Sequence, residues 1–137
     1  MTQEERMLLI KDLSARLPYA VTVEHTSGFR GTLHDLTIHH MYDDNDNVYD
    51  AICYTDFFGD EDSIYIEYFK PYLFPLSSMT EDQHVELLAN GVSDDPYTYI
   101  DSKAFNYLID FYNKNHFDYR GLIPKGLAID ATGLNIY

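Results

Sequence analysis

Histidine and carboxylate side chains that could bind a metal or move protons occur together in one segment of the chain. His34, His39 and His40 lie close to Asp35, and neutral imidazole together with carboxylate can bind Zn²⁺. Successive side chains of an extended strand point to opposite faces, so His34 and His40 share one face while Asp35 and His39 share the other. Because this spacing places no two imidazole rings side by side, we predict surface histidines near a strand end and no bound metal.

A run of aspartates follows these histidines and loosely resembles a calcium-binding loop. It consists of Asp43, Asp44, Asp46 and Asp50. An EF-hand loop needs glycine at its sixth position and glutamate at its twelfth, but counting from Asp44 these positions hold Tyr49 and Thr55. We therefore predict a solvated hairpin loop, with a weak and opportunistic cation site as the alternative.

The single cysteine, Cys53, could act as a nucleophile only beside a group that lowers its thiol pKa. Ala51 and Thr55, its neighbours on one face of an extended strand, supply no base, and the acidic surroundings should raise the thiol pKa instead. We predict a buried and unreactive side chain.

The chain also contains no Gly-x-Ser-x-Gly pattern and no glycine-rich phosphate loop, so we assign no catalytic residue and expect no cofactor.

Charge is distributed very unevenly along the chain. Nine Lys and Arg against 23 Asp and Glu give a formal net charge of −14. Residues 31–69 contain no Lys or Arg but carry ten acids, namely Asp35, Asp43, Asp44, Asp46, Asp50, Asp56, Asp60, Glu61, Asp62 and Glu67. Nucleic-acid backbones and anionic membranes are bound through Lys and Arg, so we expect neither as a direct partner. A basic protein surface fits this charge, with solubility alone as the other explanation.

Tyrosines are concentrated in the same acidic part of the chain. Six of the 13 tyrosines lie within residues 42–72, and tyrosine is enriched at protein interfaces. The sequence therefore predicts a partner-binding surface made of Tyr49, Tyr65, Asp43, Asp44, Asp46, Asp50, Asp60, Glu61 and Asp62. An ordinary half-buried sheet with an acidic rim is the alternative interpretation.

The elements that would position these residues begin with a helix over residues 2–17. Thr2 and Glu5 form a capping-box pattern, and Pro18 ends the run. The apolar residues that recur at helical spacing are Met7, Ile10, Leu13 and Leu17. We expect this stripe to be buried.

Two further helices are predicted in the second half of the chain. A capping box at Thr80 opens a short helix that closes at Asn90 and Gly91. A third helix starts near Asp101 or Ser102. Its expected buried stripe is Phe105, Leu108, Ile109 and Tyr112.

Strands are predicted between the first two helices. Period-two alternation marks residues 19–25, 31–40, 48–54 and 64–68, and Pro71 and Pro75 should stop the sheet. Short connections imply a four-stranded antiparallel meander or a small open barrel. Residues 116–137 read as an irregular C-terminal wrap with a short strand near residues 127–129. The fold class is therefore α+β in a single domain, residues 1–137.

Three stretches together resemble a family of small uncharacterised proteins from gut Bacteroidales genomes, phages and mobile elements. They are MTQEERMLLIKDLSARLPY, KPYLFPLSSMTEDQ and NKNHFDYRGLIPKGLAID. The resemblance implies a protein of the bacterial or phage-infected cytoplasm with an accessory role, and it implies no activity.

The start of the chain lacks an apolar run long enough for a signal peptide, and no apolar stretch is long enough to span a membrane. We therefore expect a cytoplasmic protein.

These observations favour a non-enzymatic accessory protein that binds a basic protein surface. In its sharpest form it would be an inhibitor that occupies the nucleic-acid-binding surface of a host protein. One alternative is a small enzyme whose site assembles from distant residues such as His39, Asp35 and Tyr65. Another is a structural subunit that forms a homodimer through an apolar tyrosine face.

Overall fold

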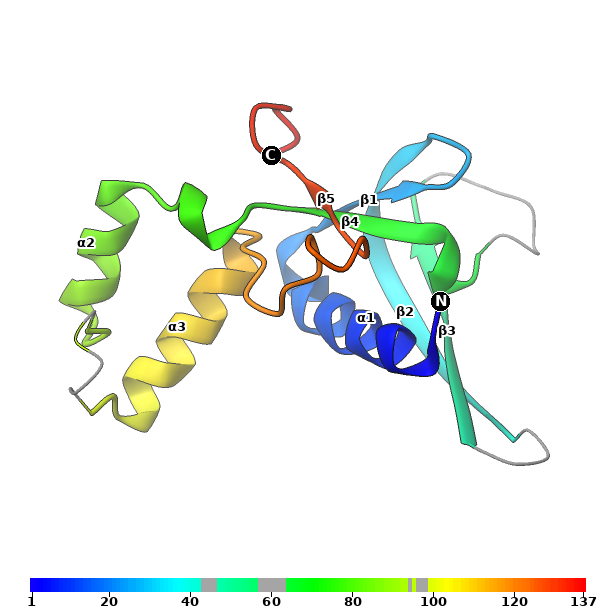
Figure 1. Cartoon of the computed structure of the whole chain (residues 1–137), viewed down its shortest axis with the longest axis horizontal. Coiled ribbons are helices and arrows are strands. Elements are labelled where there is room, and N and C mark those ends of the chain that lie inside the picture. Colours follow the sequence, from blue (N-terminus) through cyan, green and yellow to red (C-terminus); the bar gives the residue numbers. More distant parts are fainter. Residues whose placement is uncertain (43–46, 57–63, 94, 96–98) are drawn as a thin grey trace.

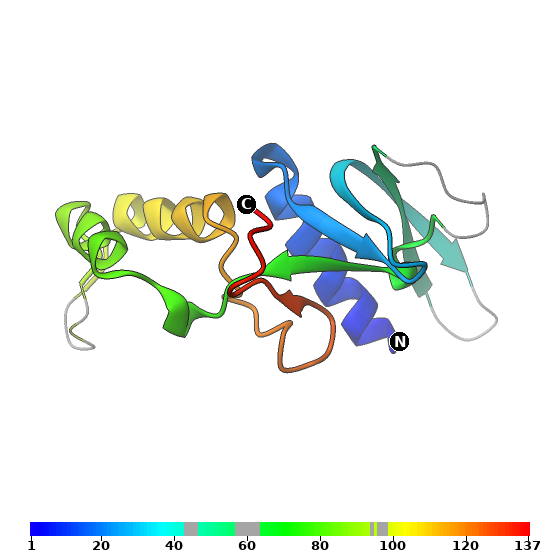
Figure 2. The ribbon, with the colours of Figure 1, turned by 90° about the horizontal axis from the view of Figure 1, so that it is seen from above.

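In the computed structural model, which describes residues 1–42, 47–56, 64–93, 95 and 99–137, the chain folds as three α-helices and an open five-stranded sheet (Figure 1). This confirms the α+β class. The β2–β3 hairpin and the α2–α3 pair lie at opposite ends of the molecule, with α1 and the other strands between them (Figures 1 and 2). Among the described residues, none of the helices is long and apolar enough to cross a membrane.

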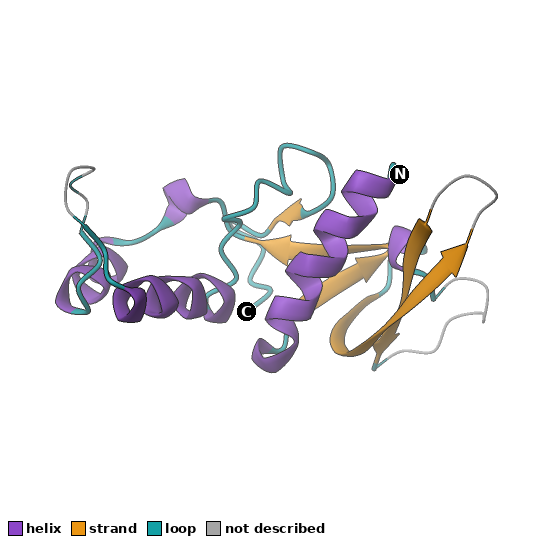
Figure 3. Cartoon of the chain, turned by 90° about the horizontal axis from the view of Figure 1, so that it is seen from below, coloured by secondary structure: helices purple, strands orange, loops and turns teal. Residues whose placement is uncertain are grey.

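The first helix, α1, spans Gln3–Arg16 and forms as its pattern predicts. The Thr2 hydroxyl accepts a hydrogen bond from the backbone N–H of Glu5 at 3.1 Å, which satisfies one of the free donors at the helix start. Its apolar stripe faces the sheet: Ile10 and Leu13 are buried together with Leu9, while Met7 and Leu17 are partly buried. Figure 3 shows α1 lying across one face of the sheet.

Three consecutive strands form the predicted antiparallel meander. They are β1 (Thr22–His25), β2 (Arg30–Tyr42) and β3 (Asn47–Thr55). In β1 the buried residues alternate with partly exposed ones, as period-two spacing requires. The pairing of β2 with β3 shifts register between Leu33 and Asp35, which is the signature of a β-bulge.

The predicted fourth strand is wrong in position and in pairing. Residues 64–68 contribute one bridge, between Tyr65 and Ile52, and then a 3₁₀ turn over Ile66–Tyr68. The strand proper is β4 (Phe69–Leu73), which pairs antiparallel with β1 rather than with β3. Pro71 lies inside β4 instead of ending the sheet. It is tolerated there because β5 (Ile129–Asp130) pairs with β4 only at Tyr72 and Leu73, past the proline.

The resulting strand order, β3-β2-β1-β4-β5, makes a mixed sheet with β4 and β5 parallel. Tyr65 bridges the outer edge of β3, whereas Phe69, four residues later, pairs with β1 two strands away. Four residues span at most about 14 Å, so the sheet must curl to bring these positions together. The fold is an open, curved, mixed sheet of five strands, where the sequence predicted four antiparallel strands in a meander or a small open barrel.

The curl encloses the first of two hydrophobic clusters, called here the sheet cluster. It is mainly aliphatic and packs the buried face of α1 against β1, β2 and β3. Its fully buried members include Leu9, Leu13, Val21, Val23, Leu33, Ile66, Leu73 and Leu122.

The second cluster, called here the helix cluster, lies between α2 (Glu81–Ala89) and α3 (Ser102–Lys114). α2 begins after its predicted cap, Thr80, and α3 begins at Ser102 with Asp101 as its N-cap, within the predicted start near Asp101 or Ser102. The buried members of the cluster are Leu87, Val92, Ala104, Phe111 and Phe117.

The predicted stripe of α3 is wrong at its first member. Phe105 is 55% exposed, while Ala104 and Phe111 are buried, and Leu108 and Tyr112 are partly buried. The helix packs on α2 and on the segment at Phe117 instead of on the sheet. Its buried face is therefore turned toward Ala104 and Phe111, away from Phe105.

Residues 116–137 form the predicted irregular wrap, with β5 as its short strand. The wrap is attached to the end of β4, where the backbone N–H of Phe74 donates to His116 O and the N–H of Asp118 donates to Phe74 O, both at 2.8 Å. It joins the sheet cluster to the helix cluster.

Candidate functional site

Most of the acids predicted to bind a partner lie outside the described residues. These are Asp43, Asp44, Asp46, Asp60, Glu61 and Asp62. Tyr49 lies in β3, opposite His40 in the register. The described remainder of the predicted surface is Asp50 and Tyr65.

Asp50 is buried and does not belong to an exposed surface. It is 8% exposed, and its carboxylate lies 3.8 Å from the Arg6 guanidinium of α1. The same carboxylate accepts a hydrogen bond from the backbone N–H of Ala51 at 2.8 Å. Buried carboxylates are tolerated when paired in this way, so Asp50 anchors β3 to α1. The sequence placed Asp50 in the predicted partner-binding surface, but the structure pairs its buried carboxylate with Arg6 of α1.

Four exposed residues of the hairpin share one face, which we call the outer hairpin face: Asp35, Thr37, His39 and Tyr54. The opposite face is partly exposed as well, since Ile38 is 51% exposed. The register pairs Asp35 with Tyr54 and Thr37 with Ile52, and directly paired residues share a face. Tyr54 is 46% exposed. Tyr65, half-buried, adjoins this face through its bridge to Ile52. The face combines a carboxylate with exposed aromatic and polar groups.

The same register separates the residues of the enzyme alternative. Asp35 and His39 are four residues apart on one strand, about 13 Å, and Tyr65 is two strands away from β2, about 10 Å. General acid–base groups act within hydrogen-bond reach of a shared substrate atom. The outer hairpin face therefore does not bring these three groups to one reacting centre.

The histidines and the cysteine of this region are placed as follows. His34, at the bulge, and His39 are exposed. Among the residues that the structure describes, no group of three or more His, Cys, Asp or Glu side chains could hold a metal ion.

Cys53 is buried. Its burial, and secondly the nearby negative charge of Asp50, raises the pKa of its thiol to about 12. This confirms the predicted burial of the thiol, and its pKa is raised in the predicted direction.

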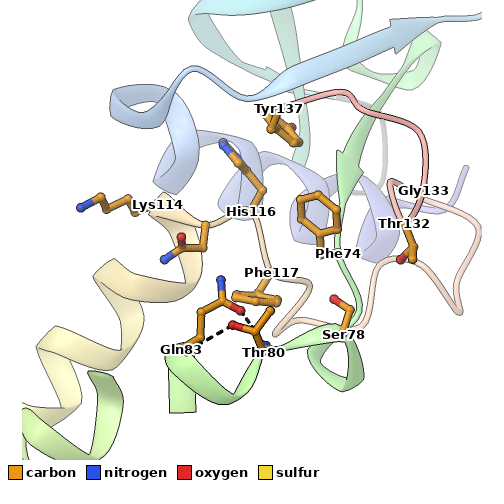
Figure 4. Close-up of a pocket in the computed structure, with 11 residues that line it drawn as sticks. Phe74, Ser78, Thr80, Gln83, Lys114, His116, Phe117, Thr132, Gly133 and Tyr137 are labelled. Atoms are coloured by element: carbon orange, nitrogen blue, oxygen red, sulfur yellow. Dashed lines mark hydrogen bonds between the residues drawn. The ribbon is translucent and has the colours of Figure 1, made fainter. Parts of the chain in front are cut away.

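A pocket that the sequence did not predict lies where the wrap meets the helix pair (Figure 4). Its volume is about 500 Å³, within the range of small-molecule sites. Side chains reach it from the end of β4, the start of α2, the end of α3 and the C-terminal residues. The lining residues are Phe74, Ser78, Thr80, Gln83, Lys114, Asn115, His116, Phe117, Thr132, Gly133 and Tyr137.

His116 is the most unusual residue of this pocket. Its backbone is left-handed, with φ of 60°, and the residue is 8% exposed. Its Nδ1 atom is buried without a hydrogen-bond partner in the described structure. Burial, and secondly the positive charge of Arg16, lowers the pKa of His116 to about 4. The imidazole is therefore neutral at neutral pH.

Tyr137 covers one side of His116. The two rings stack at a centroid distance of 3.6 Å and an interplanar angle of 8°. The Tyr137 hydroxyl donates to Tyr72 O at 2.7 Å and accepts from the Thr22 N–H at 3.0 Å. Although 46% of the residue is exposed, its hydroxyl is enclosed between β1 and β4, and this burial raises the phenol pKa to about 12.

A buried ion pair supports the pocket from behind. Arg16 donates to both carboxylate oxygens of Asp12, at 2.8 and 3.0 Å, and to Phe117 O at 2.6 Å. Arg120 of the wrap lies 3.5 Å from the same carboxylate, and both guanidinium groups face the Tyr119 ring. Asp12 and Arg16 are fully buried. Their contacts fix the wrap to α1 and so position the residues on either side of Phe117.

Sequence reasoning missed the pocket because its members are distant along the chain. His116 was not singled out. Its one local signal is its position directly after the α3 C-cap, Asn115, where residues with left-handed backbone commonly end helices.

Comparisons with protein-family models, with curated proteins and with solved structures find no match. The arguments for function therefore depend on geometry and charge.

Proposed function

We propose that this chain is a non-enzymatic binding protein whose outer hairpin face docks on a basic surface of a partner protein. The observation that carries the proposal is the exposed Asp35–Tyr54 pair, within a run of 39 residues, 31–69, that has ten acids and no Lys or Arg. Interfaces of this kind combine aromatic contact area with complementary charge at the rim.

The charge pattern supports a basic partner rather than solubility alone. A domain surface that serves solubility usually mixes charges of both signs. A surface of one sign repels itself and lowers the stability of the folded state. A basic partner would relieve that repulsion.

The partner that fits best is a protein whose basic surface normally binds nucleic acid. A chain with a net charge of −14 and a segment free of cations can compete for such a surface. Together with the resemblance to proteins of gut Bacteroidales, phages and mobile elements, this leads us to propose an accessory inhibitor of a host nucleic-acid-binding protein, acting in the cytoplasm.

The test is capture from a lysate of a Bacteroidales host, with the purified protein on beads. We expect a specific basic protein on the wild type and at least tenfold less of it on the double variant Asp35→Asn/Tyr54→Ala. The matched control is Asp110→Asn/Tyr99→Ala, which removes an exposed aspartate and a tyrosine that is 86% exposed, both away from the hairpin. Equal capture by both variants would rule out the outer hairpin face as the binding surface.

A further inference from the structure

The hydroxyl of Tyr137 bridges two strands of the sheet where their direct pairing ends. The register of β1 and β4 reaches Val23 opposite Pro71, so Thr22 and Tyr72 would be the next residues to face each other. The Tyr137 hydroxyl lies between them. It accepts a hydrogen bond from the Thr22 N–H at 3.0 Å and donates one to Tyr72 O at 2.7 Å. A side chain of the C-terminal wrap thus takes a place between the two strands.

The two backbone groups require opposite hydrogen-bonding roles from the group that lies between them. The Thr22 N–H needs an acceptor, and the C=O of Tyr72, a residue that is 1% exposed, needs a donor. A hydroxyl group fills both roles through one oxygen atom, whereas a carboxylate cannot donate and an ammonium group cannot accept. Because a buried backbone group without a partner is costly, this position selects a hydroxyl group.

The space next to these backbone groups fits an aromatic ring. The Tyr137 ring stacks on the His116 imidazole at a centroid distance of 3.6 Å, and the Phe74 ring lies 5.9 Å from it. Figure 4 shows Tyr137 beside His116 and Phe74. The pKa of His116 is lowered to about 4, so at neutral pH the stack joins two uncharged rings. Together these groups form a site for a phenol, called here the tyrosine slot and made of Thr22, Tyr72, Phe74 and His116.

Tyr137 reaches the slot at the end of an exposed segment, residues 132–137, called here the C-terminal strap. The strap starts from Ala131, which is buried and whose backbone N–H donates to β4 at 2.8 Å. Residues 132–135 are exposed, and Gly133 has a left-handed backbone with φ of 76°. Figure 1 shows the segment after β5 looping outward from the rest of the fold. The strap is therefore held at its two ends, with an exposed turn between them.

This arrangement allows the strap to open without breaking a strand or a helix. Glycine adopts backbone conformations on either side of φ zero at little steric cost, and hinges consist of a few loop residues that absorb such changes. Although its hydroxyl is enclosed, Tyr137 is 46% exposed, so its ring can be approached from solvent. Thr132, Gly133 and Tyr137 also form one side of the pocket beside His116, and opening the strap would join this pocket to the slot.

We propose that the tyrosine slot is a binding site for small phenols and that the C-terminal strap closes it by placing Tyr137 inside. When the strap opens, the hydroxyl of the ligand replaces that of Tyr137 between Thr22 and Tyr72, and the ligand ring stacks on His116. A tethered group competes at an effective concentration of about millimolar, so a free phenol has to outcompete the strap. The site is separate from the outer hairpin face and does not depend on the function proposed for it.

The test is a titration of the wild type and of Tyr137→Ala with p-cresol, followed by backbone amide NMR signals of the full chain. We expect p-cresol to shift the signals of Thr22 and His116 in the variant at about millimolar concentration or below. The wild type should bind it about tenfold more weakly, because the tethered Tyr137 competes.

Two matched probes test the role of the hydroxyl group. Toluene has the same ring without a hydroxyl, and 4-methylanisole carries a methyl ether that accepts a hydrogen bond but cannot donate one. Both should bind Tyr137→Ala about tenfold more weakly than p-cresol does, because the Tyr72 C=O is left without a donor. Equal affinities of p-cresol and toluene would overturn the assignment of the slot to phenols.

A second variant keeps the ring and decides the point if Tyr137→Ala does not fold. Tyr137→Phe retains the stack on His116 but loses both hydroxyl hydrogen bonds, so the Thr22 amide should exchange with deuterium about tenfold faster. This variant should bind p-cresol about threefold to tenfold more tightly than the wild type. The control Tyr99→Phe, at a tyrosine that is 86% exposed and outside the slot, should change neither quantity. Equal p-cresol affinity of Tyr137→Phe and wild type, or no shifts at Thr22 and His116 in any folded variant, would overturn the proposal.

Discussion

The outer hairpin face and the pocket beside His116 differ in charge and in what holds them in place. The hairpin face is formed by exposed side chains on two paired strands, in a segment without cations. The pocket is lined by donors and rings, and behind it lies the fully buried pair of Asp12 and Arg16. Changes behind the pocket should therefore affect folding, whereas changes on the hairpin face should affect binding and leave folding almost unchanged.

The largest effect is expected at Asp12. Asp12→Ala leaves the buried guanidinium of Arg16 without its carboxylate, which should lower the free energy of unfolding by about 3–5 kcal/mol. The control is Glu67→Gln at the Arg6 pair, where the distance is 3.4 Å and the Glu67 side chain is 38% exposed. There the loss should stay below about 1 kcal/mol. Urea denaturation of both variants measures the difference, and similar losses would show that the buried pair does not hold the wrap.

A smaller effect is expected in the helix cluster. Phe111 stacks on the pocket residue Phe117 at 6.1 Å and is 4% exposed. Phe111→Ala should lower the free energy of unfolding by about 3 kcal/mol, the low end for such a change, because the cluster borders a pocket and can relax. Phe105→Ala on the same helix should cost about 0.5 kcal/mol or less, since Phe105 is 55% exposed. A reversed order would mean that α3 packs through the stripe predicted from its sequence.

A third prediction concerns the pH dependence of stability. The pKa of His116 is about 4 in the folded protein against an ordinary 6.5, so the unfolded chain binds this proton first as the pH falls. His116 therefore lowers the free energy of unfolding progressively from about pH 6.5 down to about pH 4, and the loss is complete below that.

Two measurements check this prediction. An NMR titration should show the His116 imidazole titrating well below pH 6. His116→Asn should reduce the slope of stability against pH between 4 and 6.5. An ordinary titration of His116 near pH 6.5 would contradict the buried placement of its ring.

Local patterns in the sequence were sufficient for some elements of the fold. The capping boxes at Thr2 and Thr80 predicted the starts of α1 and α2, because capping depends on residues within one turn. The start of α3 was predicted near Asp101 or Ser102, and Asp101 is its N-cap. Period-two alternation identified β1, β2 and β3 for a similar reason. Burial of Cys53 and its raised thiol pKa followed from its place on a strand among acids.

Features that depend on distant contacts were not predicted. β4 pairs with β1 instead of β3 because residues 66–68 turn the chain across the curled sheet, and nothing local to Pro71 indicates this. The buried face of α3 depends on where α2 and Phe117 lie. The pocket brings Phe74, His116 and Tyr137 together from three separate segments, so no spacing within one segment could reveal it.

Association kinetics with the captured partner show whether the acidic hairpin region binds a basic protein. The variant Asp43→Asn/Asp44→Asn/Asp46→Asn removes three charges from the segment that joins β2 to β3. The matched control, Glu4→Gln/Asp82→Asn/Asp110→Asn, removes three exposed charges from the helices.

We expect association of the wild type to slow steeply between low and physiological salt, because exposed charges are screened over about 8–10 Å. The hairpin variant should associate about tenfold more slowly at low salt with little change in dissociation, since steering charges act mainly on the association rate. The control should stay within about twofold of the wild type. If both variants associate at the wild-type rate, the acidic hairpin is a solvated surface and does not bind the partner.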